Sequence, residues 1–334
     1  MMDVSLTESQ QAVASLAVQV LSGPDPWKQL AQAGLLDLGD EGLGLPEATV
    51  LLTEIGRHAT PDSLRALATL MTGALPVARW GSGELKQALL PGVASGELIL
   101  TAAIREPSDP APASPATTLT DRKITGTKVG VLYAEQSRLI LVPASSGVAL
   151  VDPRGENVTL TRTPTSTGQP EYTLRMDQAP VDGILGPAGC VRDLYQLAVA
   201  GACALADGAL VGALALTRNH VASRRQFGRP LAEFQAVSQQ IADVYIAART
   251  LHLATVSACW RLAEGRDAAG DLDVAAYWCA EHAPRSVRIC HHLHGGLGMD
   301  ATYSLHGYSS LIGDLVRFLG GADYRLERLA CTST

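Results

Sequence analysis

The order in which helical and strand patterns follow one another limits what this chain can fold into. Residues 1–95 show helical periodicity broken at the turn sequences SGPDPW, GLGLP and ATPDS. Residues 96–188 change to short β-branched runs separated by Gly, Pro and Ser, and residues 189–334 return to a helical pattern. Long helices are expected at about 190–223, 233–265, 271–298 and from about 323. The order predicts an α+β protein with an N-terminal helical domain, a middle antiparallel β domain and a C-terminal four-helix bundle.

Charge and hydropathy argue against nucleic-acid and membrane partners. The 334 residues carry a net charge of −7 with no block of like charges, so no basic surface is expected for nucleic acid. Residues 194–216 are apolar over the length of a membrane span. They include Asp207, which would cost about 2.5–3.5 kcal/mol at the centre of a bilayer. We therefore expect a helix buried inside a bundle.

The cysteines and the N-terminus predict a cytoplasmic location. Six cysteines are scattered through apolar helical surroundings without a CxxC pair, which favours reduced, buried thiols: Cys190, Cys203, Cys259, Cys279, Cys290 and Cys331. The first residues lack a basic region and include Asp3 and Glu8, so no signal peptide is expected. Thr7 and Gln10 instead fit a capping box that opens a helix.

Two turns contain residues suited to a dinucleotide. In SRRQFGRPLAEFQAVSQQIADVY (223–245), Arg224 can donate charge-assisted hydrogen bonds to a pyrophosphate and Phe227 offers an apolar face. In HHLHGGLGMDATY (291–303), Gly295 and Gly296 lack the Cβ atoms that would keep a dinucleotide away from the backbone. The alternative is a solvated helix end at Arg224 with helix-capping glycines.

These two turns and the domain order resemble the acyl-CoA dehydrogenase family over nearly the whole chain. The family pattern is Arg-x-x-Phe-Gly with a Gln seven residues after the Gly, followed later by a Gly-Gly-x-Gly turn. The resemblance implies that these groups hold the ADP half of the FAD of a neighbouring subunit. The cofactor-binding residues that it predicts are Arg224, Gln226, Phe227, Gln235, His292, Gly295 and Gly296.

The histidine cluster before the glycine turn invites a metal interpretation. His291, His292 and His294 have no carboxylate at ligand spacing, and only Cys290 lies beside them. Adjacent helical positions point in different directions, so the histidines cannot all face one ion. We therefore predict no metal site, and the resemblance places His292 at a polar position facing the adenosine.

The half-site for an isoalloxazine ring departs from the family pattern. Family members carry a Thr-Glu-Pro turn with a Gly-rich loop, and then a Trp and a Thr packed on the flavin. This chain has Arg105 at the Thr of that turn and prolines in place of the glycines. Gly130 stands at the Trp position and Leu132 at the second Thr position. The resemblance therefore implies that this chain's own flavin half-site is dismantled.

Both positions for the catalytic base lack a carboxylate. The reaction needs a Glu that removes the α-proton of an acyl thioester while the β-hydride passes to the flavin. The family keeps it before the last helix, at Gly320 or Gly321 here, or on the first bundle helix, at Ala198 here. We expect Asp323 to be the N-cap of the last helix. The alternative is that Asp323 is the base.

The resemblance is strongest to the short non-catalytic subunit of actinobacterial α2β2 steroid side-chain acyl-CoA dehydrogenases. It implies an oxidoreductase of cholesterol catabolism that desaturates a propionyl-length side chain, as in 3-oxo-pregnene-20-carboxyl-CoA. The partner would be a longer subunit carrying the catalytic Glu, with FAD shared at the interface and an electron-transfer flavoprotein as electron acceptor. The alternatives are a self-sufficient homotetrameric dehydrogenase using Asp323 and a non-enzymatic scaffold with the same fold.

Overall fold

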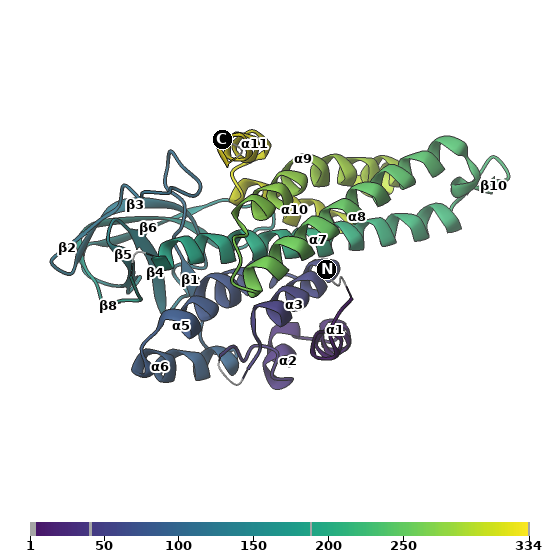
Figure 1. The fold of residues 1–334 in the computed structure, drawn as a ribbon. Helices are drawn as coiled ribbons and strands as arrows, with labels where there is room; N and C mark the ends of the chain where they lie inside the picture. The colour runs from purple at the N-terminus through teal and green to yellow at the C-terminus, as the bar shows by residue number, and fades with distance from the viewer. Residues whose placement is uncertain (1–4, 40–41, 188, 333–334) are drawn as a thin grey trace. The chain divides into compact units, whose positions relative to one another are not determined.

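The computed structural model describes residues 5–39, 42–187 and 189–332 (Figure 1). By their internal contacts these residues form two compact units. One unit combines Leu52–Thr60 with the chain from Ala202 onward, and the other combines Thr7–Leu51 with Pro61–Gly201. The boundaries at 95/96 and 188/189 stay a prediction, since the contacts divide the chain differently.

Helices dominate the described part of the first hundred residues. They are α1 (Glu8–Leu21), α2 (Pro26–Gln32), α3 (Leu45–His58), α4 (Ser63–Ala66), α5 (Leu75–Trp80) and α6 (Gly83–Ala94), with a π-helical stretch over Leu67–Ala74. The predicted capping box is confirmed, because the Thr7 side chain accepts from the Gln10 backbone N–H and the Gln10 side chain accepts from the Thr7 backbone N–H. The turn sequences read from the chain separate these helices as expected.

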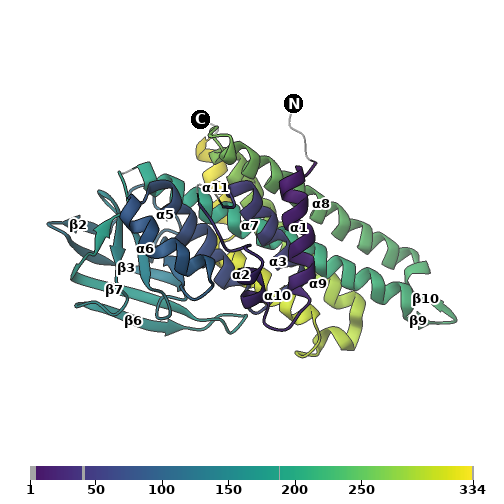
Figure 2. The same cartoon turned by 90° about the horizontal axis from the view of Figure 1, so that it is seen from below.

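Eight strands form two four-stranded sheets in the middle of the chain. They are β1 (Leu100–Ala102), β2 (Thr118–Thr120), β3 (Lys123–Leu132), β4 (Leu139–Ala144), β5 (Gly147–Val151), β6 (Val158–Thr163), β7 (Glu171–Pro180) and β8 (Gly183–Ile184). The strand orders are β1-β4-β5-β8 and β2-β3-β7-β6. Figure 2 shows β3, β7 and β6 side by side. Val131, Ile140 and Leu174 belong to one buried apolar cluster built from both sheets.

One strand pairing corrects the prediction of an antiparallel domain. β1 pairs with β4 in parallel, with Leu100 opposite Leu139 and Ala102 opposite Leu141. Parallel neighbours need a long connection between them, and here the chain from β1 to β4 passes through β2 and β3 of the other sheet. The local sequence of β1 does not encode that direction, so the pattern alone could not reveal it.

The long apolar helix is α7 (Gly189–Ser223), close to the predicted 190–223. It is the one helix among the described residues long and apolar enough to cross a membrane, and 89% of its apolar window is buried in the protein. Asp207 is buried, with Oδ2 2.8 Å from Nδ1 of His252. A Cβ at Gly208 would collide with the carbonyl oxygen of Thr53, so this glycine lets α3 approach closely. These contacts support a core helix.

The C-terminal region holds one helix more than predicted. After α7 come α8 (Gln235–Ala263), α9 (Ala269–His294), α10 (Leu305–Phe318) and α11 (Ala322–Thr332). The prediction of four helices missed α10, because Gly307 and two serines weaken its intrinsic helical preference. Burial of Leu311, Ile312 and Leu315 stabilises it instead.

A buried charge cluster attaches α11 to α9. Asp273 on α9 and Arg325 on α11 are each about 97% buried, and their Oδ1 and Nη1 atoms lie 2.9 Å apart. Nε of Arg328 lies 3.0 Å from the same oxygen. Nε of Arg325 also donates to the Leu319 carbonyl at 2.7 Å. One carboxylate therefore fixes the last helix and the turn before it.

The six cysteines are all in the thiol form, without a disulfide among them. Five are buried, and Cys331 on α11 is exposed, which corrects the expectation that all six are buried. Complete burial raises the pKa of the Cys279 thiol to about 12. The buried thiols act as small apolar side chains.

Candidate functional site: two turns and a vacant base position

The Arg-x-x-Phe-Gly turn forms a tight two-stranded hairpin after α7. β9 (Arg225–Gln226) pairs with β10 (Arg229–Pro230), and the two residues between them have positive φ, 51° at Phe227 and 84° at Gly228. Positive φ at both central residues is typical of a type I′ turn, in which a bulky residue is unusual. The Phe227 side chain is nevertheless 92% exposed. The hairpin presents an aromatic ring to solvent at a strained position.

Ring contacts stabilise the hairpin at the end where it joins the following helix. Phe227 meets Phe234 edge to face, with ring centroids 6.2 Å apart. The guanidinium of Arg229 lies over the Phe234 ring, 4.1 Å from its centroid. Nη2 of Arg225 donates to the Gly228 carbonyl at 2.9 Å. These contacts hold the turn while the outer face of Phe227 stays free.

The Gly-Gly-x-Gly turn follows α9 directly. Gly295 caps the helix with a φ of 59°, and Gly295–Met299 form a 3-10 turn. Gly295 therefore has the helix-capping role that the alternative interpretation of this turn gave it. A Cβ at Gly295 or Gly296 would meet nothing within 4 Å, so both glycines border open space. Met299 is 83% exposed, which adds a second apolar side chain to this surface.

Stacked histidines bring the two turns together. The rings of His220 on α7 and His294 on α9 lie 4.4 Å apart and 23° from parallel. The Arg224 backbone N–H donates to the His220 carbonyl at 2.8 Å, so the hairpin starts one helical turn past this stack. We call the surface formed by both turns the cradle. It contains the seven predicted residues, all exposed: Arg224, Gln226, Phe227, Gln235, His292, Gly295 and Gly296.

The cradle fits the ADP half of a dinucleotide in its chemistry. An exposed arginine supplies donors for a pyrophosphate, an exposed ring supplies an apolar face, and two glycines leave the backbone accessible. The assignment of these seven residues to FAD stays a prediction. Among the described residues, no group of three or more His, Cys, Asp or Glu side chains is arranged to hold a metal ion.

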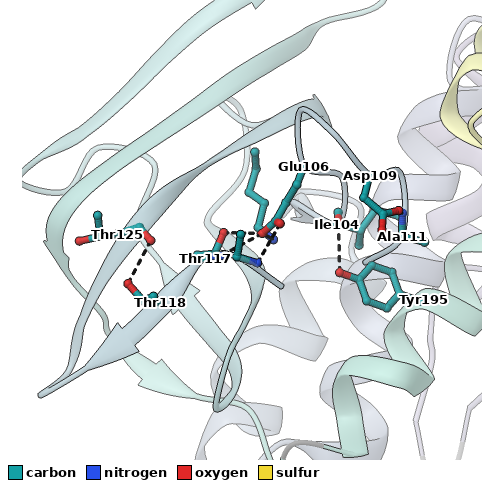
Figure 3. Close-up of polar contacts among 10 residues, drawn as sticks. Ile104, Glu106, Asp109, Ala111, Thr117, Thr118, Thr125 and Tyr195 are labelled. Carbon is teal, nitrogen blue, oxygen red and sulfur yellow. Dashed lines mark hydrogen bonds and ion pairs between the residues drawn. The ribbon is translucent and has the colours of Figure 1, made fainter. Parts of the chain in front are cut away.

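A buried ion pair organises the loop after β1, where the resemblance places a flavin ring. Glu106 accepts from Nζ of Lys128 at 2.8 Å and from the hydroxyl of Thr117 at 2.7 Å (Figure 3). The backbone N–H groups of Ala116 and Thr117 also donate to this carboxylate. Burial alone would raise the pKa of Glu106, but these hydrogen bonds lower it to about 2. The anchor closes residues 106–117 into a compact loop.

Arg105 lies in the space beside Gly130. A Cβ at Gly130 would approach Nη1 of Arg105 to 2.7 Å, and Gly130 has a φ of 67°. The backbone holds the pair together, since the Val129 N–H donates to the Arg105 carbonyl at 3.0 Å. Tyr195 on α7 supports the same loop by donating to the Ile104 carbonyl at 3.2 Å (Figure 3). An aromatic side chain at position 130 would have to displace the end of the Arg105 side chain, and the loss of a flavin wall here stays a prediction.

The predicted base positions hold no acidic group in this structure. Ala198 is fully buried within α7. Gly320 and Gly321 have φ values of 89° and 86° and follow the end of α10, where their N–H groups bond to Arg317 and Val316 carbonyls. Consecutive left-handed glycines of this kind terminate a helix. The double glycine is therefore a helix cap.

Asp323 is not the N-cap that the sequence predicted. Helix α11 begins at Ala322, so Asp323 lies inside the first turn. The Arg325 N–H bonds to the Gly321 carbonyl, which starts the helix before the aspartate. The error arises because the cap is provided by a glycine backbone rather than by a side chain. Asp323 is exposed and still interacts favourably with the helix N-terminus.

Comparison with known proteins decides the family. The acyl-CoA dehydrogenase N-terminal domain model matches residues 10–97, and the C-terminal domain model matches residues 197–323. Acyl-CoA dehydrogenase FadE28 of Mycobacterium tuberculosis is 47% identical over 336 residues, covering 98% of each chain. This chain belongs to the acyl-CoA dehydrogenase family. The predicted family is confirmed.

Solved acyl-CoA dehydrogenase structures share the fold. A variant of the Tcur3481-Tcur3483 steroid ACAD is 31% identical, with a TM-score of 0.89 and 97% of each chain covered. The ChsE4-ChsE5 complex from Mycobacterium tuberculosis is 29% identical, with a TM-score of 0.89 and 99% of each chain covered. Membership makes this chain part of an oxidoreductase family of flavoproteins.

Sequence reasoning missed two parts of the acyl-CoA dehydrogenase site region. The Glu106–Lys128 anchor had one visible signal, a lysine in the middle of β3. The His220–His294 stack had none, because the residues lie 74 positions apart on different helices. Only the packing of α7 against α9 reveals it.

Proposed function

We propose that this chain is the non-catalytic subunit of a heteromeric FAD-dependent acyl-CoA dehydrogenase. The observation that carries the proposal is an asymmetry within the chain. The cradle is exposed and chemically complete, whereas the base positions are a buried alanine, Ala198, and the helix-capping pair Gly320 and Gly321. Such a chain can complete a neighbour's cofactor site without acting as the proton acceptor.

The partner would be a longer subunit of the same family that carries the catalytic Glu, in an α2β2 heterotetramer. Support comes from the similar ChsE4-ChsE5 complex, which contains two differently named proteins, and from Tcur3481-Tcur3483. The exposed Phe227 and Met299 side chains also leave apolar surface that such a partner would cover. FAD would then lie at the interface of the two subunits.

Within that complex the chain binds and orients the cofactor. FAD, when bound, accepts the hydride that leaves the β-carbon of the acyl thioester. Arg224 would neutralise the pyrophosphate, and Phe227 would cover an apolar face of the dinucleotide. The backbone at Gly295 and Gly296 would approach it closely. The α-proton goes to the partner's carboxylate, so residues of this chain hold no proton in the reaction.

The proposed substrate is a CoA-activated steroid side chain of propionyl length, of the 3-oxo-pregnene-20-carboxyl-CoA type, as in cholesterol catabolism. The similarity to the Tcur3481-Tcur3483 steroid ACAD supports a steroid substrate. Arg105 beside Gly130 supports the loss of this chain's own flavin wall. With two of four flavin sites given up, space could remain for a bulky ring system. We place the enzyme in the cytoplasm, with an electron-transfer flavoprotein as electron acceptor.

The test is the flavin content of the purified protein. We expect the chain alone to be colourless and the complex with its longer partner to be yellow, with two FAD per tetramer and bleaching by the steroid acyl-CoA. Four FAD per tetramer would contradict the proposal. A yellow, active homotetramer would favour Asp323 as base. A colourless chain that binds no partner would favour a non-enzymatic scaffold.

A further inference from the structure

The His220–His294 stack is the packed contact from which both turns of the cradle start. His294 is the last residue of α9, and Gly295 follows it directly. His220 lies one helical turn before Arg224, and its backbone carbonyl accepts a hydrogen bond from the Arg224 N–H. With ring centroids 4.4 Å apart, this stack is a direct contact between the helix ends from which the two turns start.

The hydrogen bonding of His294 fixes its neutral tautomer. Its Nδ1 lies 2.8 Å from the Cys290 carbonyl, which can only accept, so Nδ1 carries the hydrogen. The Nε2 atom is buried and has no hydrogen-bond partner among the described residues. It therefore holds a lone pair. Protonation would create a buried N–H without an acceptor and a charge without a counterion.

Within the described part of the chain, the groups that act on the two rings include no carboxylate. Arg224 follows α7, Cys290 and His291 lie on α9, and the Tyr303 ring centroid lies 5.3 Å from that of His294. Burial lowers the pKa of His294, the Cys290 hydrogen bond opposes this, and His220 and His291 lower it further. Burial and then Arg224 lower the pKa of His220. Both rings are therefore held neutral near pH 7.

We propose that His220 and His294 are positioning residues for the cradle, which is assembled while both rings are neutral and loosens when either ring takes up a proton. The proposal rests on the proposed function, because the ligand of the cradle is taken to be the ADP half of FAD. It adds a pH response to that site. Neither histidine needs to touch the cofactor.

The sign of the response follows from proton linkage. A histidine whose pKa is lowered in the assembled cradle binds its proton more readily once the cradle loosens. Low pH therefore favours the loosened form, and FAD affinity falls as the pH drops from the ordinary histidine pKa, near 6.5, toward the lowered pKa of the assembled cradle. One proton limits the loss to about tenfold per pH unit.

The experiment measures FAD dissociation from the complex between pH 8 and 5.5. We expect the wild type to lose affinity below about pH 6.5. His294→Phe keeps a ring in the stack and should respond less steeply, and the double variant His220→Phe/His294→Phe should show a flat profile. The matched control is His282→Phe. His282 also stacks on an aromatic ring of α9, Trp278, at 4.0 Å, and its variant should keep the wild-type pH response.

A second readout separates this inference from the proposed function. The imidazole signals of His294 in the full chain alone, followed by NMR, should titrate below the ordinary histidine pKa. His220→Phe provides a second variant at a less buried site if His294→Phe fails to fold. An unchanged pH profile in both variants, or a His294 pKa at or above 6.5, overturns the inference. A complex that binds no FAD at any pH refutes the proposed function instead, while the NMR titration still decides the histidine pair.

Discussion

Nζ of Lys128 lies 2.8 Å from Oε1 of Glu106, and the lysine side chain is completely buried. A buried lysine is expensive to desolvate, so the contact persists only because the carboxylate and the fold provide a matched partner. Thr117 completes the arrangement, and the three residues connect β3 with both ends of the loop over residues 106–117. The stability of this loop therefore depends on one ion pair.

Replacing Lys128 should expose that dependence. Lys128→Met leaves the Glu106 charge buried without its counterion, and we expect the free energy of unfolding to fall by about 3–5 kcal/mol. Urea unfolding of the full chain measures this. Lys123→Met is the matched control, because Lys123 lies on the same strand but is exposed, and it should change stability by less than about 0.5 kcal/mol. Equal losses of unfolding free energy in both variants would contradict the stabilising role of the Glu106–Lys128 ion pair.

The same carboxylate predicts how stability depends on acid. The pKa of Glu106 is about 2 in the folded chain, below its ordinary value of 4.5. The contribution of the Glu106 carboxylate to the free energy of unfolding is therefore present above pH 4.5 and is lost as the pH falls from 4.5 toward 2. Urea midpoints measured across this range should drop more steeply for the wild type than for Glu106→Gln. Parallel curves would show that Glu106 is not the group responsible.

Asp273 should govern the attachment of α11. Asp273→Asn leaves Arg325 buried without its carboxylate, and we expect a loss of about 3–5 kcal/mol together with faster hydrogen exchange along α11. Glu281→Gln, which removes a surface pair with Arg285 on α9, should cost less than about 1 kcal/mol. If α11 remains protected from exchange in Asp273→Asn, apolar packing rather than the ion pair holds it.

Phe227 should separate stability from cofactor binding. Phe227→Asn places Asn-Gly at the two positive-φ positions of the hairpin, which this turn type prefers, so the free energy of unfolding should stay equal or rise by up to about 1 kcal/mol. The ring is 92% exposed, so little packing is lost. FAD affinity of the complex should nevertheless fall, by about tenfold for the loss of one aromatic contact. An unchanged FAD affinity would show that Phe227 does not contribute to cofactor binding.

Asp323 should be dispensable for turnover. It is exposed in the first turn of α11, where a negative charge interacts favourably with the helix N-terminus. Asp323→Asn should leave the turnover of the complex within about twofold of the wild type and cost at most about 1 kcal/mol of stability. A collapse of turnover with an intact fold would identify Asp323 as the base.

The sequence predicted what local periodicity determines and missed what distant packing determines. The α7 pattern and the Thr7 capping box were confirmed because each is encoded within a few helical turns. The parallel direction of β1 was missed because it depends on a strand about 40 residues away. Helix α10 was missed because tertiary burial overrides its weak propensity.

The site shows the same division. The exposed residues of the cradle were named from two motifs, since the chemistry of arginine, phenylalanine and glycine is local. The link between the motifs, His220 against His294, could come only from coordinates. The prediction that Asp323 is the N-cap was wrong, because the backbone of Gly321 starts the helix and Asp323 lies inside its first turn.

The paired left-handed glycines after α10 bear on how this chain could evolve. A glycine codon can become a glutamate codon through one base change, so an acidic group at position 320 or 321 is genetically close. The backbone there disfavours any side chain by about 1–2 kcal/mol at each residue, and α11 depends on the same turn through Arg325. Under the proposed function, a gain of the missing base would therefore require this turn to be rebuilt, and single mutations would not be enough to make the chain independent of its partner.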